Sequence, residues 1–312
     1  MNIGFIGVGV MGSGMAGSLL KKGHRLTVFD LHRASAQPLV DAGAVWADSP
    51  RAVAEKNEVV FTSLPGPAEA EAVALGPNGI LEGIRPGAGY IDLTSNSPTV
   101  VRRIHQRFTE KGAAMLDSPV SGGPAAARSG KLSLMVGGDP EVYEKYLPLL
   151  QTRGDKITYT GGIGNGSICK LMHNCTLYGL QAIVAECLTL GVKAGVDPKA
   201  LWRVLKEGAV GQAVLFQRSL PETYFKGRFE PPNFALKLAF KDVALATSLG
   251  REFDVPMALS SLTFQEMLTA MNRGWGNKDS RSAMLLQEER AGGIQVRIPE
   301  NEIAEELNRP KT

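Results

Sequence analysis

Short apolar runs alternate with helix-compatible stretches through the first half of the chain. The apolar runs lie at 2–6, 25–29, 58–62, 89–93, 113–117 and 132–138. Several of them end in loops rich in serine, proline and glycine, and stretches such as 99–111 fit helices. Alternating strands and helices form a parallel sheet, because the chain crosses back over the sheet between strands. The pattern predicts a doubly wound, mostly parallel α/β sheet, with ligands beyond the carboxyl ends of the strands.

The second half of the chain has a helical pattern instead. The stretch 166–194 contains no proline and, as a single helix, would be about 45 Å long. Further helical patterns follow at 198–207, 234–253 and 260–273. Strand-like alternation returns only at 294–298, and we expect the glutamate-rich stretch after Pro299 to be a solvated or frayed helix.

A cluster of glycines between residues 161 and 166 separates the two patterns. We therefore predict an N-terminal α/β domain over residues 1–163 and an all-α C-terminal domain over residues 164–312. The second domain would begin with a long inter-domain helix. Because an apolar-rich helix of that length is hard to bury in so small a domain, we expect the helical halves to pair in a homodimer or homotetramer.

The first apolar run leads directly into a Gly-x-Gly-x-x-Gly sequence at 7–12 and then into a helical stretch. This order is typical of Rossmann-type dinucleotide-binding domains. The first glycine permits a tight turn, the second lets a pyrophosphate approach the backbone, and the third allows the helix to pack on the strand. N–H groups at the start of the helix then bind the diphosphate. We predict cofactor contacts at Gly7, Gly9, Val10, Met11 and Gly12.

An acidic residue, Asp30, ends the second apolar run about twenty residues after the glycine turn. A carboxylate at this place hydrogen-bonds the adenosine ribose and repels a 2′-phosphate, which favours NAD over NADP. His32 and Arg33 follow and would soften that preference. The alternative is a glycine-rich turn followed by an acid that only caps the next helix.

Composition and charge exclude several classes of protein. The net charge of +3 comes from scattered lysines and arginines, which gives no reason to expect a nucleic-acid partner. The longest apolar runs are shorter than a membrane span, and the first strand begins at once, so we expect neither a membrane anchor nor a signal peptide. The three cysteines, at 169, 175 and 187, suit a reduced, cytoplasmic protein, and no metal-ligand spacing occurs.

Four blocks of sequence together resemble the β-hydroxyacid dehydrogenase family, whose best-known member is 3-hydroxyisobutyrate dehydrogenase. In order, they are the glycine block at 4–12, Asp-x-Pro-Val-Ser-Gly-Gly at 117–123, Gly-x-Gly-x-x-x-Lys-x-x-x-Asn at 164–174, and Lys-Asp at 241–242. The resemblance implies an NAD-dependent dehydrogenase or reductase that transfers a hydride between nicotinamide and a small hydroxy acid or its semialdehyde. One departure from many relatives is His173-Asn174 in place of Asn-Asn.

The resemblance places the general acid/base at Lys170, with Asn174 beside it. A lysine can take the hydroxyl proton if burial or nearby cations lower its pKa. Helical spacing puts the two side chains on one face, where Asn174 would donate to the substrate oxygen. Taken alone, Lys170 would be an ordinary solvated lysine. His173 is expected to neighbour the site or, more simply, to pack within the helix.

Other site residues are assigned in the same way. Successive N–H groups of a glycine-rich turn form an anion site, so the substrate carboxylate is placed at Ser121, Gly122 and Gly123. The resemblance brings Lys241, oriented by Asp242, toward the cofactor or substrate. It also lines the nicotinamide half of the cofactor with Leu64, Pro65 and Ser95.

Three interpretations remain open. The first is an NAD-dependent dehydrogenase of a small, 3-hydroxyisobutyrate-like hydroxy acid. The second is another oxidoreductase on the same scaffold, either a glyoxylate or succinic-semialdehyde reductase, which typically has Asn-Arg in place of Asp30-Leu31, or an imine reductase-like enzyme. The third is a protein that binds NAD without turnover. The sequence does not identify the substrate. Candidates for contacting it from the helical domain are Trp202, Gln212, Phe216 and Phe234.

Overall fold

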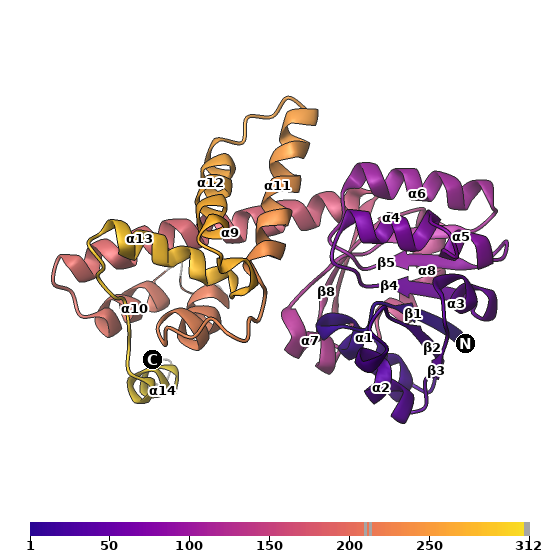
Figure 1. The fold of residues 1–312 in the computed structure, drawn as a ribbon, viewed down its shortest axis with the longest axis horizontal. Coiled ribbons are helices and arrows are strands. Elements are labelled where there is room, and N and C mark those ends of the chain that lie inside the picture. Colours follow the sequence, from indigo (N-terminus) through magenta and orange to yellow (C-terminus); the bar gives the residue numbers. More distant parts are fainter. Residues whose placement is uncertain (209–210, 212–213, 309–312) are drawn as a thin grey trace. The chain divides into compact units, whose positions relative to one another are not determined.

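The computed structural model describes residues 1–208, 211 and 214–308, which form two compact units (Figure 1). The first unit ends at Met172 and the second begins at His173. The division falls inside one continuous helix, α9 (Asn165–Lys193), which begins in the first unit.

A mostly parallel sheet forms the centre of the first unit. Its parallel strands lie in the order β3-β2-β1-β4-β5-β6. Their bounds are β1 Asn2–Ile6, β2 Arg25–Phe29, β3 Val45–Trp46, β4 Val59–Thr62, β5 Gly89–Asp92 and β6 Ala114–Asp117. Beyond β6, the strand β8 (Ser133–Gly138) runs antiparallel to β6 and β7 (Val120–Ser121) and parallel to β9 (Lys156–Gly161). The predicted α/β fold class is therefore confirmed.

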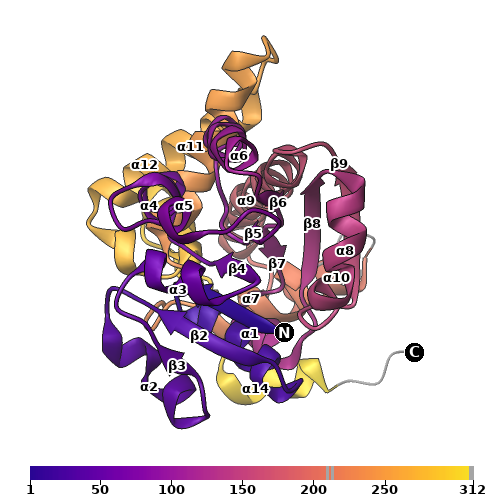
Figure 2. The ribbon, with the colours of Figure 1, turned by 90° about the vertical axis from the view of Figure 1, so that its right-hand side faces the viewer.

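Helices cover both faces of this sheet, as Figure 2 shows. They are α1 Val10–Lys21, α2 Arg33–Asp41, α3 Pro50–Lys56, α4 Pro67–Leu75, α5 Ile80–Gly83, α6 Pro98–Glu110, α7 Gly123–Ser129 and α8 Pro140–Leu150. Phe5 and Phe61 belong to one buried apolar cluster, and their strand neighbours Ile6 and Val60 belong to a second. Because successive side chains of a strand point to opposite faces, the sheet is buried on both sides.

The strand register aligns the ends of the central strands. Ile6 pairs with Phe29 and with Thr62, Thr62 pairs with Asp92, and Asp92 pairs with Asp117. The loops that follow these strands therefore leave the sheet along one edge. This edge carries the glycine turn, Asp30 and the predicted loops after the other strands.

The second unit is helical. After α9 come α10 Pro198–Glu207, a π-helix Leu215–Tyr224, α11 Leu236–Glu252, α12 Ala258–Asn272, two short 3₁₀ helices Trp275–Asn277 and Ser280–Met284, α13 Leu285–Arg290 and α14 Glu300–Leu307. Among its described residues no strand forms, although Ala235 and Asp279 make an isolated bridge. The all-α prediction is confirmed. Trp202, Phe216 and Phe225 are fully buried and form the centre of its core.

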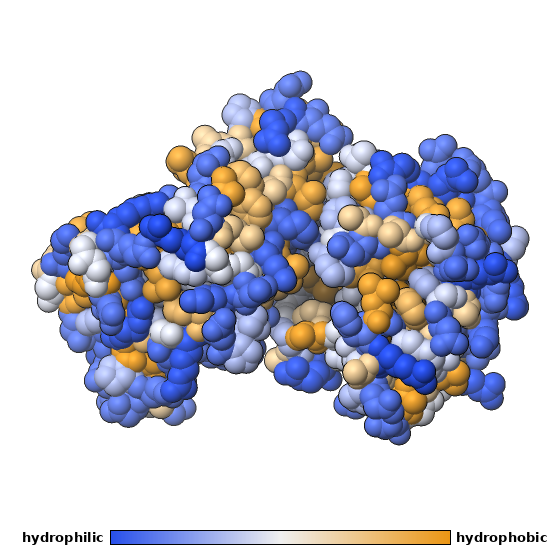
Figure 3. Space-filling model, viewed as in Figure 1, coloured by the Kyte–Doolittle hydropathy of each residue, from blue (hydrophilic) through white to orange (hydrophobic). Residues whose placement is uncertain are grey.

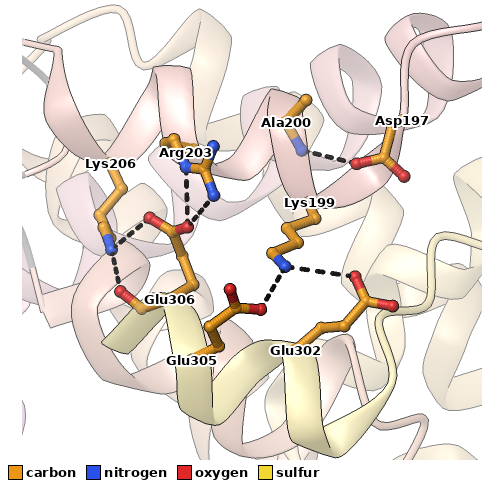
Figure 4. A network of polar contacts seen from close by, with 8 residues as sticks. All are labelled: Asp197, Lys199, Ala200, Arg203, Lys206, Glu302, Glu305 and Glu306. Carbon is orange, nitrogen blue, oxygen red and sulfur yellow. Dashed lines mark hydrogen bonds and ion pairs between the residues drawn. The ribbon is translucent and has the colours of Figure 1, made fainter. Parts of the chain in front are cut away.

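The end of the chain differs in two respects from what its local sequence pattern suggests. Residues 294–298 form no strand; Val296 and Ile298 are buried in the helical core, and the Ile298 amide donates to the Phe225 carbonyl. The stretch after Pro299 forms the expected helix, α14, and most of its residues are exposed, but Ile303 and Glu306 are buried, so one side of the helix is packed on the unit. Figure 4 shows ion pairs that join its glutamates to α10. The glutamates that suggested solvation are partners of basic residues far away in sequence.

The helix α9 is long and apolar enough to span a membrane by length and composition alone, a property that it shares with the core helices of many water-soluble proteins. Polar side chains along it are nevertheless buried inside the protein. Gln181 is 4% exposed, and its amide nitrogen donates to the Ser280 carbonyl at 2.9 Å. This buried contact joins α9 to the other helices of the second unit.

Candidate active site

The glycine turn between β1 and α1 is crowded at two glycines and open at the third. Gly7 has a φ of +83°, and a Cβ there would clash with the Ser63 carbonyl. A Cβ on Gly12 would clash with the carbonyl of Gly7. On Gly9, by contrast, a Cβ would meet no described atom within 4 Å. The turn therefore leaves open space only where a pyrophosphate has to approach the backbone.

The first turn of α1 presents the groups that bind a diphosphate. Gly9 caps the helix, and Val10 is 70% exposed despite its apolar side chain. The N–H groups of the first turn have no partner within the helix and lie at its positive end. Val10, Met11 and Gly12 provide these groups, so the residues present fit a dinucleotide.

Asp30 is held firmly at the end of β2. The Val8 amide donates to Oδ2 of Asp30 and the His32 amide donates to Oδ1, both at 2.8 Å. Asp30 therefore connects the glycine turn to the segment just before α2. Its role is not limited to capping the helix that follows. Each carboxylate oxygen keeps a second lone pair that can accept a ribose hydroxyl.

A buried polar network fixes the loops after β4 and β5. Asp92 is 1% exposed and accepts hydrogen bonds from the Thr62 hydroxyl, the Thr94 amide and the Asn96 side chain. Burial raises the pKa of Asp92, and these hydrogen bonds oppose that rise. The Thr94 hydroxyl also accepts from the Leu64 amide at 3.1 Å.

The network thus positions the segments that contain Leu64, Pro65 and Ser95. Pro65 is exposed, and Leu64 and Ser95 are half-buried. Leu64 also borders the glycine turn, because its Cδ2 would lie 2.9 Å from a Cβ on Gly7. The predicted nicotinamide-side loops therefore lie on the same edge of the sheet as the diphosphate turn.

Asp117 joins the end of β6 to the start of α9. Its Oδ1 accepts from the Gly164 amide at 2.8 Å and its Oδ2 from the Ser167 amide at 2.7 Å. The side chain is buried, which raises its pKa, and the two amides lower it again in part. The carboxylate thus caps the helix that carries Lys170.

The predicted carboxylate site follows four residues later. Ser121 ends β7, and the next two residues, Gly122 and Gly123, have φ values of +132° and +73°. A Cβ on Gly122 would lie 2.8 Å from the Ala126 side chain, whereas one on Gly123 would meet no described atom within 4 Å. The turn needs glycine at both positions and is open at the second.

Lys170 and Asn174 occupy neighbouring turns of α9. Lys170 is 8% exposed and Asn174 is 3% exposed. A spacing of four residues puts both on one face of the helix. Lys170 is therefore not the solvated surface lysine that its sequence position alone would suggest.

In the second unit, Asn174 is anchored by Asp242. The Asn174 side-chain nitrogen donates to Oδ2 of Asp242 at 2.5 Å, and Lys241 forms an ion pair with Oδ1 at 2.8 Å. Asp242 is fully buried, whereas the Lys241 side chain is 24% exposed. His173 is exposed, and its Nδ1 lies 3.0 Å from Oδ1 of Asn174, so a packing role does not describe it.

Sequence reasoning missed the structural roles of Asp92, which lies within the predicted strand at 89–93, and of Asp117, which begins the 117–123 block. The available signal was an acid at the carboxyl end of each of two adjacent parallel strands. Of the side chains considered for reading the substrate, Trp202 and Phe216 are core residues, since the Trp202 Nε1 donates to the Phe216 carbonyl. Gln212 lies outside the described residues. Within the described part of the chain, no cluster of metal-ligating side chains occurs.

A dinucleotide-binding fold with a buried lysine and amide defines the class of NAD-binding oxidoreductases. Comparison with known proteins agrees. A protein-family sequence model, described as the NAD binding domain of 6-phosphogluconate dehydrogenase, matches residues 2–161. A second model, described as the NAD-binding region of NADP-dependent 3-hydroxyisobutyrate dehydrogenase, matches residues 164–286.

Individual relatives extend over nearly the whole chain. The 2-(hydroxymethyl)glutarate dehydrogenase of Eubacterium barkeri is 33% identical, over 94% of this chain and 96% of its own. The NAD-dependent L-serine dehydrogenase of Pseudomonas aeruginosa is 35% identical, over 89% of this chain and 94% of its own. A structure of Mycobacterium tuberculosis 3-hydroxyisobutyrate dehydrogenase with L-serine is 26% identical, with a TM-score of 0.81, and covers 91% of this chain and 98% of its own.

The chain belongs to the β-hydroxyacid dehydrogenase family, in the group similar to 3-hydroxyisobutyrate dehydrogenase. It is an NAD-dependent oxidoreductase that acts on CH–OH groups. The predictions of family, enzyme class and cofactor are confirmed.

Proposed function

We propose that the chain oxidises a small hydroxy acid, or reduces the matching semialdehyde, with Lys170 as the proton-transfer group. The observation that carries this proposal is the burial of Lys170, one turn before an asparagine whose amide is held by Asp242. When the carbinol carbon loses a hydride, the hydroxyl oxygen has to lose a proton. A positioned amine is a suitable acceptor.

Hydride transfer itself is the chemistry that NAD supplies when bound. The glycine turn and Asp30 would hold the cofactor, while Lys170 takes the proton from the hydroxyl oxygen or returns it. Asn174 keeps one side-chain N–H after its bond to Asp242, and this group would orient the reacting oxygen.

The remaining site residues would bind rather than react. The backbone N–H groups of Ser121, Gly122 and Gly123 would donate hydrogen bonds to the substrate carboxylate, an arrangement supported by the two successive positive φ angles. Lys241 adds a positive charge whose place is set by the buried Asp242. Leu64, Pro65 and Ser95 would border the nicotinamide.

The substrate class is tested by following absorbance at the NADH band. The panel would contain 3-hydroxyisobutyrate, L-serine, glycerate and 4-hydroxybutyrate with NAD, and tartronate semialdehyde and a cyclic imine with NADH. Turnover of a three- or four-carbon hydroxy acid supports the proposal. Turnover of semialdehydes alone would favour a reductase, turnover of cyclic imines would favour the imine-reductase alternative, and NAD binding without any turnover would contradict catalysis.

We also propose that the helical unit pairs with a second copy of the chain. Figure 3 shows apolar side chains at the surface over α11 and α12. Leu259 and Leu262 of α12 are 72% and 64% exposed, and Ile183 and Leu190 on one face of α9 are 52% and 70% exposed. Large exposed apolar patches mark interaction sites. A monomer mass by light scattering at micromolar protein would contradict pairing, whereas a dimer or tetramer mass supports it.

A cytoplasmic location is proposed from the cysteines. Cys169, Cys175 and Cys187 are all free thiols, as expected in a reducing compartment. Cell fractionation that finds the enzyme in another compartment would contradict this.

A further inference from the structure

The junction between β6 and α9 holds two segments of the proposed site together within the first unit. The Asp117 carboxylate accepts hydrogen bonds from Gly164 and Ser167, which are 47 and 50 residues away in sequence. Ser121 follows Asp117 by four residues, and Lys170 follows Ser167 by three. One carboxylate therefore fixes both the start of the carboxylate-binding loop and the helix that bears the lysine.

The junction is packed too tightly to shift without cost. A Cβ on Gly166 would lie 2.6 Å from the Asp117 carbonyl oxygen and would clash with the Met135 carbonyl. A Cβ on Gly137 would lie 2.5 Å from Oδ1 of Asp117. Glycine at these two positions is what allows the helix start to approach the carboxylate.

We propose that Asp117 is a positioning residue that acts through Lys170, which deepens the function proposed above and rests on it. A carboxylate at a helix N-terminus is favourable because it meets the positive end of the helix and its unpaired N–H groups. Bonds to the amides of Gly164, directly before α9, and of Ser167, in its first turn, would fix the rotation and axial position of α9. This would place the Lys170 amine relative to the loop after Asp117, which would hold the substrate carboxylate and so set where the reacting oxygen lies.

The matched control is Asp139, which caps α8 in the same unit. Its carboxylate accepts from the Glu141 amide at 2.8 Å and the Val142 amide at 3.3 Å, and α8 carries no residue of the proposed site.

Asp117→Ala should lower kcat by about 10²-fold, because a misplacement of about 1 Å costs that much. The KM for NAD should stay within about twofold, since the cofactor is held by other residues. Asp139→Ala should leave both constants unchanged. Should Asp117→Ala fail to fold, Asp117→Asn keeps the volume and one acceptor.

The double variant separates positioning from a general loss of structure. With Lys170 already replaced by alanine, Asp117→Ala should change kcat by less than about twofold. If Asp117→Ala lowered kcat by the same factor in the wild-type and Lys170→Ala enzymes, the positioning role would be overturned. Wild-type kcat in a folded Asp117→Ala enzyme would also overturn it. Neither result would overturn the proposed function. Wild-type kcat in Lys170→Ala would overturn the proposed function first and the positioning role with it. Hydrogen exchange at the Gly164 and Ser167 amides should speed up in Asp117→Ala, and unchanged exchange would contradict the cap itself.

Discussion

The side-chain nitrogen of Asn174 lies 2.5 Å from Oδ2 of Asp242, and the other carboxylate oxygen of Asp242 is paired with Lys241. Asp242 is fully buried, so removing either partner would leave a buried carboxylate without that contact. The pair orients the amide before any substrate arrives. Asn174 is thus a group fixed by its neighbours, and in the proposed mechanism it orients the reacting oxygen rather than transferring a proton.

Asn174→Ala should therefore lower kcat by about tenfold, less than the loss expected at Lys170. It should also destabilise the protein by about 1–3 kcal/mol, because a buried carboxylate loses a donor. The control is Gln181, a buried amide two turns later on α9 that donates to Ser280. Gln181→Ala should reduce stability in urea without reducing kcat. A kcat loss in Asn174→Ala as large as that of Lys170→Ala would contradict the division of roles.

Two glycines of the cofactor turn should respond differently to alanine. Gly9 has a φ of −66° and open space around it, so Gly9→Ala should fold normally but bind NADH at least tenfold more weakly. Gly12→Ala should lower the melting temperature, because its Cβ would clash with the Gly7 carbonyl. Binding followed by NADH fluorescence and melting by circular dichroism measure the two effects. Wild-type NADH affinity in Gly9→Ala would place the diphosphate elsewhere.

Asp30 should set the choice between the two nicotinamide cofactors. Its carboxylate is fixed by the Val8 and His32 amides and would repel a 2′-phosphate. We expect kcat/KM to be at least tenfold higher with NAD than with NADP, a difference of about 1.4 kcal/mol. Asp30→Ala should bring the kcat/KM values for NAD and NADP closer together. Equal use of both cofactors by the wild-type enzyme would contradict this role.

The C-terminal helix should contribute to stability through Glu306. Its carboxylate pairs with Arg203 at 2.6 Å and Lys206 at 2.9 Å and is buried (Figure 4). Glu306→Gln should reduce the free energy of unfolding by up to about 3 kcal/mol, because breaking a buried pair leaves a charge uncompensated. The control is Glu305→Gln, which should change the free energy of unfolding little, since Glu305 is 72% exposed and solvent screens its pair with Lys199. If urea denaturation showed the same loss of unfolding free energy in Glu306→Gln and Glu305→Gln, the distinction between the buried and the exposed pair would be contradicted.

The same contacts give a pH dependence. Hydrogen bonds from Arg203 and Lys206 outweigh burial and hold the pKa of Glu306 below its usual value, and Lys199 lowers that of Glu305. A carboxylate with a lowered pKa stabilises the fold above its unfolded pKa of about 4.3. This contribution is lost as the pH falls through the folded pKa. Stability of the wild-type protein should decline below about pH 4, and less steeply in Glu306→Gln.

The fold was predictable where local patterns decide it. The apolar runs, the glycine turn and the proline-free stretch each predicted an element that the structure contains. The strands β3 and β7 are two residues long, and β9 is a polar edge strand, so neither length nor periodicity marked them. Apolar and polar residues alternate in the stretch 294–298 as in a strand, but the segment pairs with no other strand and packs into a helical core. Periodicity does not reveal this tertiary effect.

The site divides in the same way. Gly7, Gly9, Gly12 and Asp30 follow from a strand–turn–helix pattern with a physical basis in the sequence itself. The roles of Asp117 and Asp242 depend on partners about 50 and 68 residues away, and only the folded chain brings those partners together. Lys170 was assigned through a resemblance, and its burial is a property that the sequence alone did not contain.

The most direct test of the proposed chemistry is kcat of Lys170→Ala with the best hydroxy acid of the panel. If Lys170 transfers the proton, kcat should fall by about 10² to 10⁴ while NAD affinity changes little. Lys170→Arg should not restore activity, because a guanidinium does not release its proton near neutral pH. A folded Lys170→Ala enzyme with wild-type kcat would contradict the assignment and make Lys241 the next residue to test.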